Sequence, residues 1–335
     1  MTYKFALINK DRGACSMSTI GRMLHNVLKN GDNYTLDYFE TNDLDISALN
    51  GGKVIHRGVE REPYDAYFFN YHISTMRDQS GVRSELISKN LPGMKFCFHF
   101  EGFPNNPYAG LEGVNLDDFD AYFWVDPTAD FHDKRFYAFP RPLGTAKVKP
   151  YEEKEIPVIG TYGLAGHGRN LGALVQAVNA EFDRAIIRMN YAPGSYYGDV
   201  GGYAKWEVAT QCLPIAKPGI EIRLTENYFS DQELLEWLSQ NTLNVFFYAR
   251  GTTGISSATD QALMVGRPMI CSADHAFRHI HQYIPPYPET SFKKAIEIGV
   301  EQVAKMQQAW NAESCRKRFN EILFDENGKL KPKHG

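Results

Sequence analysis

The chain has 335 residues, of which 43% are hydrophobic and 23% are charged, and its formal net charge is −4 at pH 7. This apolar fraction is enough to bury a large core, so a generally disordered protein is excluded. At roughly 100–200 residues per domain, the length predicts two domains. The near balance of acidic and basic residues makes nucleic acid a less favoured partner, because duplex binding needs a broad cationic face.

Sequence signals for membranes and for disulfides are missing. No apolar run approaches the ~18 residues that span a bilayer, so no membrane span is expected. The N-terminus alternates apolar and polar residues, unlike a signal peptide. The five cysteines are scattered and form no Cys-x-x-Cys pair, which indicates reduced thiols and neither a disulfide framework nor a cysteine-based zinc site. We therefore expect a cytoplasmic protein.

Strands and helices alternate in the first half of the chain. Short apolar runs predict the strands, and apolar residues at helical spacing predict the helices between them. The expected strands are 5–8, 34–39, 65–71, 94–100 and 121–125, and the expected helices are 18–29 and 80–89, with a loop of small and polar residues at 11–16. Strands separated by helices indicate a parallel sheet covered by helices.

A domain boundary is predicted between Pro140 and Pro157, where prolines surround a run rich in Lys and Glu. The alternation then restarts, and a capping box, Ser230-x-x-Glu233, opens one of the helices. The expected strands are 157–160, 185–189, 220–224, 244–248 and 269–271, and the expected helices are 170–181, 230–238, 256–265, 291–310 and 312–323. The second half therefore predicts another parallel sheet.

The most informative loop follows the strand 244–248, because open parallel sheets bind ligands at the carboxyl ends of their strands. It contains Arg250 and small residues, and hydroxyl side chains then open a helix. The unpaired N–H groups and partial positive charge of a helix start suit phosphate. The alternative is an ordinary connection with a serine cap; we favour phosphate binding. The candidate residues at this helix start are Thr253, Gly254, Ile255, Ser256 and Ser257.

A second glycine-rich loop follows the strand 157–160 and ends at Arg169, before a helix. Its glycines between residues 160 and 168 lack the spacing of a dinucleotide fingerprint, and no Gly-Lys-Ser/Thr follows as in a P-loop. Either this loop places Arg169, with His167, beside phosphates, or a helix simply starts here with Arg169 in solvent.

His99 and Glu101 lie at the end of the strand 94–100, on one face by the two-residue period of a strand. Such a pair suits proton transfer or the orientation of a substrate hydroxyl. A lone histidine in this place is more often a buried core residue.

Two further segments have less specific patterns. His275, His279 and His281 have a spacing that could bind zinc, but no second ligand motif accompanies them, so no metal site is expected. The loop 191–203 is rich in Gly and Tyr, and it either stacks on a base or sugar or is an ordinary surface loop.

Together these segments resemble the GT-B glycosyltransferases. More closely, they resemble family 4 of the retaining, nucleotide-sugar-dependent glycosyltransferases (glycosyl transferases group 1). The segments that carry the resemblance are NKDRGACSMSTIGRMLHNVLKNGDNYTLDYF, KFCFHFEGFP, FYAFPRPLG, IGTYGLAGHGRNLGALVQA and GTTGISSATDQALMVGRPMICS. The resemblance implies an α/β protein of the GT-B fold with two Rossmann-like domains facing a cleft. It implies an acceptor domain at 1–149, a donor domain at 150–310 and a C-terminal helix at 311–335 that crosses back to the first domain.

The residues of this chain can be placed on the motifs of that family. Its Gly-Gly loop corresponds to Gly13 and Ala14, its strand-ending histidine to His99, its phosphate-binding lysine to Arg169, its other basic residue to Tyr162, and its Gly-x-Pro to Gly266 and Pro268. The two glutamates of its E-x7-E motif fall at Thr253 and Gln261, so this motif is degenerate here.

The resemblance implies a hexosyltransferase-like enzyme. It would move a sugar from a nucleoside-diphosphate sugar, a co-substrate and no cofactor, to a hydroxyl acceptor, with retention and without a catalytic metal. The acceptor stays open between a glycan, a lipid-linked sugar, a protein and a nucleobase. A non-catalytic GT-B-like scaffold, which the lost glutamates favour, and a sugar-nucleotide epimerase remain alternatives.

Transfer from a nucleoside-diphosphate sugar would give individual residues the following roles. Arg169, Arg250 and the 253–257 helix start would neutralise the leaving diphosphate. The base and ribose would lie near the loop 191–203 and Gln261. The remaining candidates are Gly13 and Ala14 for donor binding, and His99 and Glu101 as catalytic residues.

Overall fold

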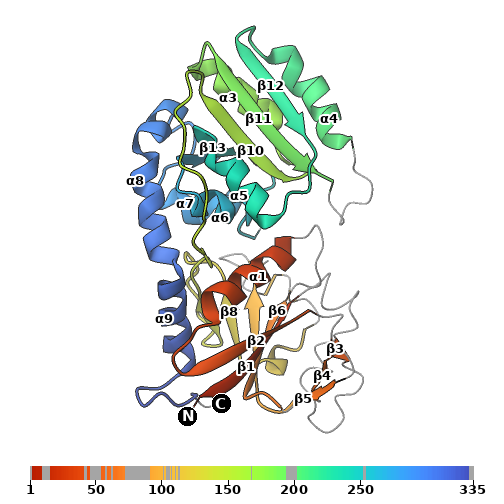
Figure 1. Cartoon of the computed structure of the whole chain (residues 1–335), viewed down its shortest axis with the longest axis vertical. Helices are drawn as coiled ribbons and strands as arrows, with labels where there is room; N and C mark the ends of the chain where they lie inside the picture. Colours follow the sequence, from red (N-terminus) through yellow and green to blue (C-terminus); the bar gives the residue numbers. More distant parts are fainter. Residues whose placement is uncertain are drawn as a thin grey trace. The chain divides into compact units, whose positions relative to one another are not determined.

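The computed structural model describes residues 2–9, 16–40, 44–45, 54–56, 59–61, 63–71, 91–100, 102, 106, 108–109, 111, 114–166, 168–193, 202–251 and 254–331. The chain divides into two compact units (Figure 1). Unit 1 is Met1–Gly144 with Trp310–Gly335, and unit 2 is Thr145–Ala309. The sequence placed the corresponding divisions at 149/150 and 310/311.

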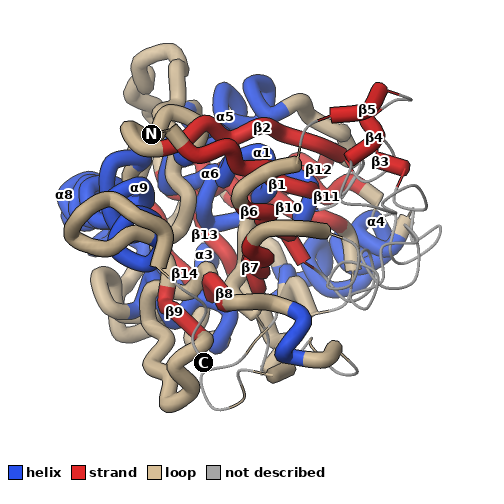
Figure 2. Tube along the Cα trace, turned by 90° about the horizontal axis from the view of Figure 1, so that it is seen from below, coloured by secondary structure: helices blue, strands red, loops and turns tan. Residues whose placement is uncertain are grey.

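Unit 1 contains a six-stranded sheet in the order β2-β1-β6-β7-β8-β9 (Figure 2). Every neighbouring pair of these strands is parallel. Its strands are β1 (Tyr3–Asn9), β2 (Tyr34–Glu40), β6 (Ala66–Tyr71), β7 (Met94–His99), β8 (Ala121–Trp124) and β9 (Phe136–Ala138). A small antiparallel sheet contains β3 (Leu44–Asp45), β4 (Val54–His56) and β5 (Val59–Arg61). The strand order of the large sheet reverses between β1 and β6, which is where doubly wound sheets bind ligands.

The core of unit 1 joins the first and the last helix of the chain. Helix α1 (Ser16–Leu28) and helix α9 (Ala312–Leu323) pack against each other and bury apolar residues against the sheet. The ring of Phe319 in α9 lies 5.0 Å from that of Phe68 and 5.6 Å from that of Phe123. Offset and tilted aromatic pairs at such distances stabilise a core beyond the area that they bury. Helix α9 is therefore part of unit 1.

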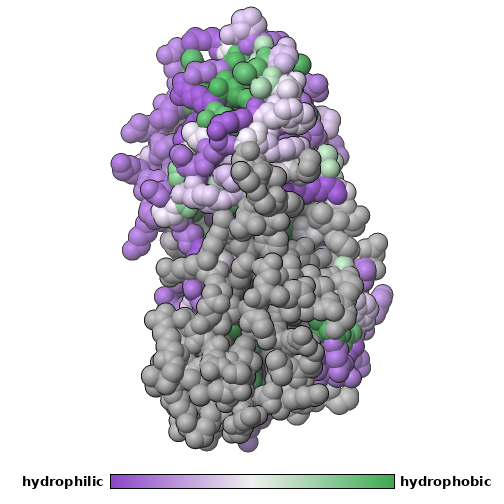
Figure 3. Space-filling view, turned by 90° about the vertical axis from the view of Figure 1, so that its right-hand side faces the viewer, coloured by the Kyte–Doolittle hydropathy of each residue, from purple (hydrophilic) through white to green (hydrophobic). Residues whose placement is uncertain are grey.

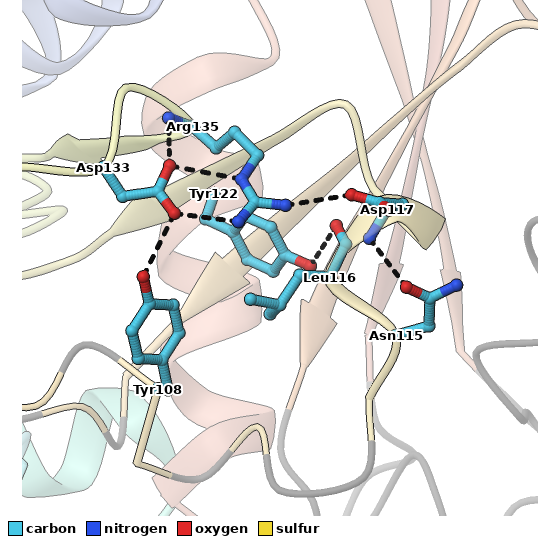
Figure 4. Close-up of polar contacts among 7 residues, drawn as sticks. All are labelled: Tyr108, Asn115, Leu116, Asp117, Tyr122, Asp133 and Arg135. Carbon is cyan, nitrogen blue, oxygen red and sulfur yellow. Dashed lines mark hydrogen bonds and ion pairs between the residues drawn. The ribbon is translucent and has the colours of Figure 1, made fainter.

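An ion-pair cluster ties together the two loops that enter β8 and β9 (Figure 4). Arg135 donates to both oxygens of Asp133, over 3.2 and 2.8 Å, and to Asp117 over 3.0 Å. Asp117 lies in the short helix η4 (Leu116–Asp118), and the hydroxyl of Tyr108 donates to Asp133 over 3.2 Å. A two-pronged guanidinium–carboxylate pair fixes orientation as well as distance. The cluster positions the amino ends of these strands, on the edge of the sheet away from its ligand-binding edge.

Unit 2 contains a five-stranded parallel sheet in the order β12-β11-β10-β13-β14. Its strands are β10 (Val158–Leu164), β11 (Ala185–Ala192), β12 (Ile220–Thr225), β13 (Leu243–Phe246) and β14 (Met269–Cys271). Numbered along the chain, this order is third-second-first-fourth-fifth, as in the Rossmann fold. The order reverses between β10 and β13, so the loops after these two strands meet at the switch point.

The helices of this part of the chain lie between these strands or follow β14, and the last of them ends at Trp310, the first residue of the second segment of unit 1. They are α3 (Leu171–Glu181), α4 (Tyr203–Glu207), α5 (Asp231–Ser239), α6 (Ala258–Met264), α7 (Arg278–His281) and α8 (Phe292–Trp310), with a π-helix η6 (Val208–Cys212) and 3-10 helices η7 (Leu213–Ile215) and η8 (His275–Phe277). The predicted capping box of α5 is confirmed: Ser230 accepts from the backbone of Glu233, and the Glu233 carboxylate accepts from the Ser230 N–H over 2.8 Å.

The segment α4–η7 carries exposed apolar side chains. Trp206, Leu213 and Ile215 are exposed here, although they are large hydrophobic residues. On the face that Figure 3 shows, hydrophobic surface gathers near the top of the view. Isolated exposed apolar residues are common on folded proteins, so they are not by themselves a sign of a binding surface.

The alternation of strands and helices predicted from the sequence is confirmed in both units, and both large sheets are parallel. Several details differ. The strands β3, β4, β5 and β9 were not predicted, Tyr203 begins a helix where a loop was expected, and the helix expected at 256–265 begins only at Ala258. The predicted helix 80–89 lies outside the described residues. Within the described part of the chain, no helix is both long and apolar enough to cross a membrane.

Candidate functional site

The loop after β10 is shaped by residues in the left-handed conformation. Gly168 has φ +80° and Asn170, the N-cap of α3, has φ +50°. A side chain at Gly168 would place its Cβ 2.8 Å from Cγ of Arg250, so only glycine fits here without displacement. The Gly168 carbonyl accepts from the N–H of Ala249 over 3.0 Å. The two loops at the switch point of the sheet are therefore joined directly.

Arg169 is buried at this junction. Its exposed fraction is 7%, its Nε donates to the Leu164 carbonyl over 3.0 Å, and its Nη1 donates to the Tyr248 hydroxyl. The guanidinium carbon lies 4.6 Å from the ring centroid of Tyr248 and 5.8 Å from that of Tyr191. No carboxylate in the described part of the chain forms an ion pair with it. The alternative of Arg169 in solvent is wrong, and the cation is desolvated with neutral partners only.

Arg250 lies on the same tyrosine ring from the neighbouring loop. Its guanidinium carbon is 4.4 Å from the Tyr248 ring centroid, and the residue is exposed. Because both guanidinium carbons lie within 4.6 Å of one centroid, they cannot be further apart than twice that distance. Two cations this close concentrate positive potential, which favours a multiply charged anion.

Two backbone amides of this loop are already used. Asp274 accepts from the N–H of Arg250 over 2.7 Å and from that of Gly251 over 3.3 Å, and its second oxygen accepts from Ala276 over 2.9 Å. These two N–H groups precede the helix start 253–257 that the sequence suggested for phosphate. An anion bound beside them would contact side chains rather than the backbone of residues 250 and 251.

The segment before α6 contacts the same tyrosine. Ser256 Oγ lies 3.0 Å from the Tyr248 hydroxyl, and its N–H donates to the Ala276 carbonyl over 3.0 Å. Ser257 is the N-cap of α6 without a side-chain cap bond, and Gly254 and Ile255 are half-buried beside it. Thr253 and His167 lie outside the described residues.

Gln261 and Tyr162, which the resemblance placed at the positions of a glutamate and a basic residue, contact each other. The Tyr162 hydroxyl lies 2.8 Å from both Gln261 Oε1 and the Ala258 carbonyl. Burial raises the pKa of Tyr162 well above its usual value, so the phenol stays protonated and donates. The Gln261 amide oxygen is therefore engaged by the protein itself.

The residues predicted in the first half are only partly described. His99 ends β7 and is buried, with its ring 5.7 Å from that of Trp124. Glu101, Gly13 and Ala14 lie outside the described residues, so their predicted roles stay predictions.

Buried amides mark the switch point of unit 1. Asn70, at the end of β6, donates to Asn9 Oδ1 over 2.6 Å and to the Met17 carbonyl over 2.8 Å, and Asn9 donates to the Ser18 carbonyl over 2.9 Å. A Cβ at Gly21 would lie 2.0 Å from the Asn9 side chain. These contacts lock the start of α1 against the ends of β1 and β6.

The three closely spaced histidines do not converge. His279 Nε2 lies 3.1 Å from Thr259 Oγ1, and His281 Nε2 lies 3.0 Å from the Ser272 carbonyl. His275 instead contacts Arg278. Among the described residues, no group of three His, Cys, Asp or Glu side chains has a metal-binding arrangement.

Tyr248 and Asp274 are the residues of this site that the sequence reading missed. Tyr248 was read only as the last residue of an apolar strand, and Asp274 was not considered. The available signal was a polar aromatic residue at the carboxyl end of a strand, directly before an arginine-containing loop. The contacts of both residues are with distant parts of the chain, so the local pattern did not reveal them.

No family model and no curated protein matches the sequence. Solved structures do match it. An alpha-glucosyltransferase (AGT) in complex with UDP is similar with a TM-score of 0.59 and 11% identity, over 96% of this chain and 99% of that one. The apo structure of OtsA is similar with a TM-score of 0.58 and 10% identity, over 95% and 98%. HepE of Anabaena in complex with UDP is similar with a TM-score of 0.57 and 7% identity, over 96% of this chain and 99% of that one.

Two other similar structures are longer than this chain. The chain spans 56% of the pneumococcal O-GlcNAc transferase GtfA and 63% of TarM from S. aureus, less than two thirds of either.

The parallel α/β sheets of both units, together with the likeness to AGT, OtsA and HepE along nearly the whole chain, show that this protein has the GT-B fold of glycosyltransferases.

Proposed function

We propose that this protein is a glycosyltransferase that moves a sugar from a nucleoside-diphosphate sugar to a hydroxyl acceptor. The observation that carries the proposal is Arg169, a buried cation at the switch point of the unit 2 sheet that has no carboxylate partner among the described residues. Removing a guanidinium from water costs several kcal/mol, by order of magnitude, unless an anion compensates it. A bound diphosphate would supply that anion.

Arg250 would complete the charge balance. At the greatest separation that the shared tyrosine ring permits, two unit charges repel each other by about 0.5–2 kcal/mol. A diphosphate between them turns this repulsion into attraction. An enzyme without a metal must neutralise its leaving diphosphate with such groups, so we infer a metal-independent reaction.

The finer features of the proposal come from the resemblance in sequence. We infer family 4 membership and retention of the anomeric configuration from it. Gly13, Ala14, Thr253 and Gln261 would line the donor, and His99 with Glu101 would act on the transferred sugar or the acceptor. The AGT and HepE structures contain UDP, which makes UDP the first nucleotide to test.

Calorimetric titration with UDP, GDP and ADP, in EDTA, tests the proposal. We expect one of them to bind with a submillimolar dissociation constant in the absence of any divalent metal. Incubation of the matching sugar nucleotide with a panel of glycan and lipid-linked acceptors should then release the nucleoside diphosphate and form a glycoside. Absence of binding by all three nucleotides would contradict the proposal.

A second candidate is a nucleotide-binding protein that does not transfer sugar. Gln261 favours it, because its amide oxygen accepts from Tyr162 and the carboxylate of the family motif is missing. The same experiment separates the two functions. A binding protein would take up the nucleotide but would neither hydrolyse nor transfer the sugar.

A further inference from the structure

We propose that Tyr248 is a positioning residue. Its hydroxyl orients two hydrogen-bond donors for a bound anion, the Arg169 guanidinium and the Ser256 hydroxyl. This inference rests on the proposed function, since the anion is the diphosphate of the donor. It also names a residue that the sequence motifs do not contain.

The directions of the hydrogen bonds follow from the chemistry of the three groups. A guanidinium has donors only, so the Tyr248 oxygen accepts from Arg169. The phenolic proton is then available to Ser256 Oγ, 3.0 Å away. Ser256 Oγ has no other hydrogen-bond partner among the described residues, so its own proton is left for a ligand. Arg169 and Ser256 thus present donors whose orientation depends on one phenol.

The phenol itself is held rigidly. The backbone N–H of Tyr248 donates to Ser272 Oγ over 2.9 Å, and Ser272 Oγ donates back to the Tyr248 carbonyl over 3.1 Å. The ring packs against Phe277 at 4.6 Å between centroids, and the residue is buried. Because the backbone and the ring of Tyr248 are held in place, little conformational entropy is lost when its hydroxyl orients the two donors. This is the advantage of a preorganised site.

The test is Tyr248→Phe, which keeps the ring under both guanidinium groups and removes only the hydroxyl. Loss of a hydrogen bond that orients the ligand-binding cation should weaken binding of the preferred nucleoside diphosphate about three- to tenfold. In an Arg169→Ala background, Tyr248→Phe should cause a smaller loss, because only the part of its effect that is transmitted through Ser256 remains.

Tyr151→Phe is the matched control. Tyr151 also lies under an arginine, 3.4 Å from the Arg267 guanidinium carbon, and its hydroxyl contacts Thr242 Oγ1 over 2.9 Å, at the amino end of β13. Its hydroxyl can be removed without touching the switch point. We expect this variant to bind nucleotide like the wild type.

A readout without nucleotide keeps the two proposals separate. The rate at which phenylglyoxal modifies Arg169, followed by peptide mass spectrometry, should rise in Tyr248→Phe, because the guanidinium loses its anchor. If the wild type binds no nucleotide, the proposed function fails while this rate still decides the role of Tyr248. An unchanged modification rate overturns the positioning role. Unchanged nucleotide affinity in folded Tyr248→Phe also overturns it. The same holds if Tyr248→Phe lowers the affinity by the same factor with and without Arg169→Ala.

Discussion

Replacing Arg169 by alanine should weaken nucleotide binding far more than it weakens the fold. Arg169 makes two hydrogen bonds, to the Leu164 carbonyl and the Tyr248 hydroxyl, and both partners are neutral. Within the part of the chain that the structure describes, no ion pair of Arg169 must be broken before a phosphate binds, so the phosphate receives the full charge-assisted contact. Such a contact contributes about 1.5–3 kcal/mol, which corresponds to a loss of about ten- to a hundredfold in affinity.

The stability of the unliganded protein should change less. Arg169→Ala leaves the Leu164 carbonyl without this donor and uncovers the Tyr248 ring, at a cost of about 1–3 kcal/mol. It also removes a desolvated charge, which offsets that cost by a similar order of magnitude. Calorimetric titration measures the affinity, and urea unfolding measures the free energy of unfolding.

Arg188→Ala is the matched control. Arg188 also covers an aromatic ring: its guanidinium carbon lies 4.5 Å from the ring centroid of Trp237. It donates to Asn241 Oδ1 over 3.0 Å. Its partner in the sheet is Gly160, four residues before the end of β10. This variant should keep its nucleotide affinity. If Arg169→Ala binds nucleotide as tightly as Arg188→Ala does, the site in unit 2 is assigned wrongly.

Three further predictions concern the surroundings of the site and the fold. Gly168→Ala should lower both stability, by about 1–2 kcal/mol, and nucleotide affinity, since alanine is strained at φ +80° and its Cβ would displace Arg250; urea unfolding and titration measure this. Asp133→Asn should cost about 0.5–1 kcal/mol in urea unfolding at pH 7. The hydrogen bond from Arg135 holds the pKa of Asp133 below 3.8, so this difference should be full above about pH 5 and shrink as the pH falls through that lowered value; a difference that grows in acid would contradict it. Ser230→Ala should remove the cap of α5 and cost about 1 kcal/mol in thermal unfolding, without changing nucleotide affinity.

The sequence was sufficient for the alternation of strands and helices in both halves, and it singled out the two loops that meet at the switch point of unit 2. Apolar periodicity and turn residues are local, and they predicted the alternation in both halves and the capping box at Ser230. Two glycine-containing loops with Arg169 and Arg250 stood out for the same reason: each follows an apolar strand and precedes a helix. The resemblance to an E-x7-E motif placed Gln261 at the position of a glutamate, but it could not say which group Gln261 contacts.

Only the tertiary structure decided which groups meet at the site. Arg169 and Tyr248 are 79 residues apart in the chain, and they meet because the sheet order brings β10 and β13 side by side. The pairing of β13 with β14 lets Asp274, which follows β14, accept from the amides at residues 250 and 251, and the pairing of β10 with β13 places both guanidinium groups on one ring. Helix α9 likewise joins unit 1 through contacts with a sheet whose strands lie near the other end of the chain. Local patterns determine where elements begin and end, whereas the contacts that bury a charge depend on which elements become neighbours.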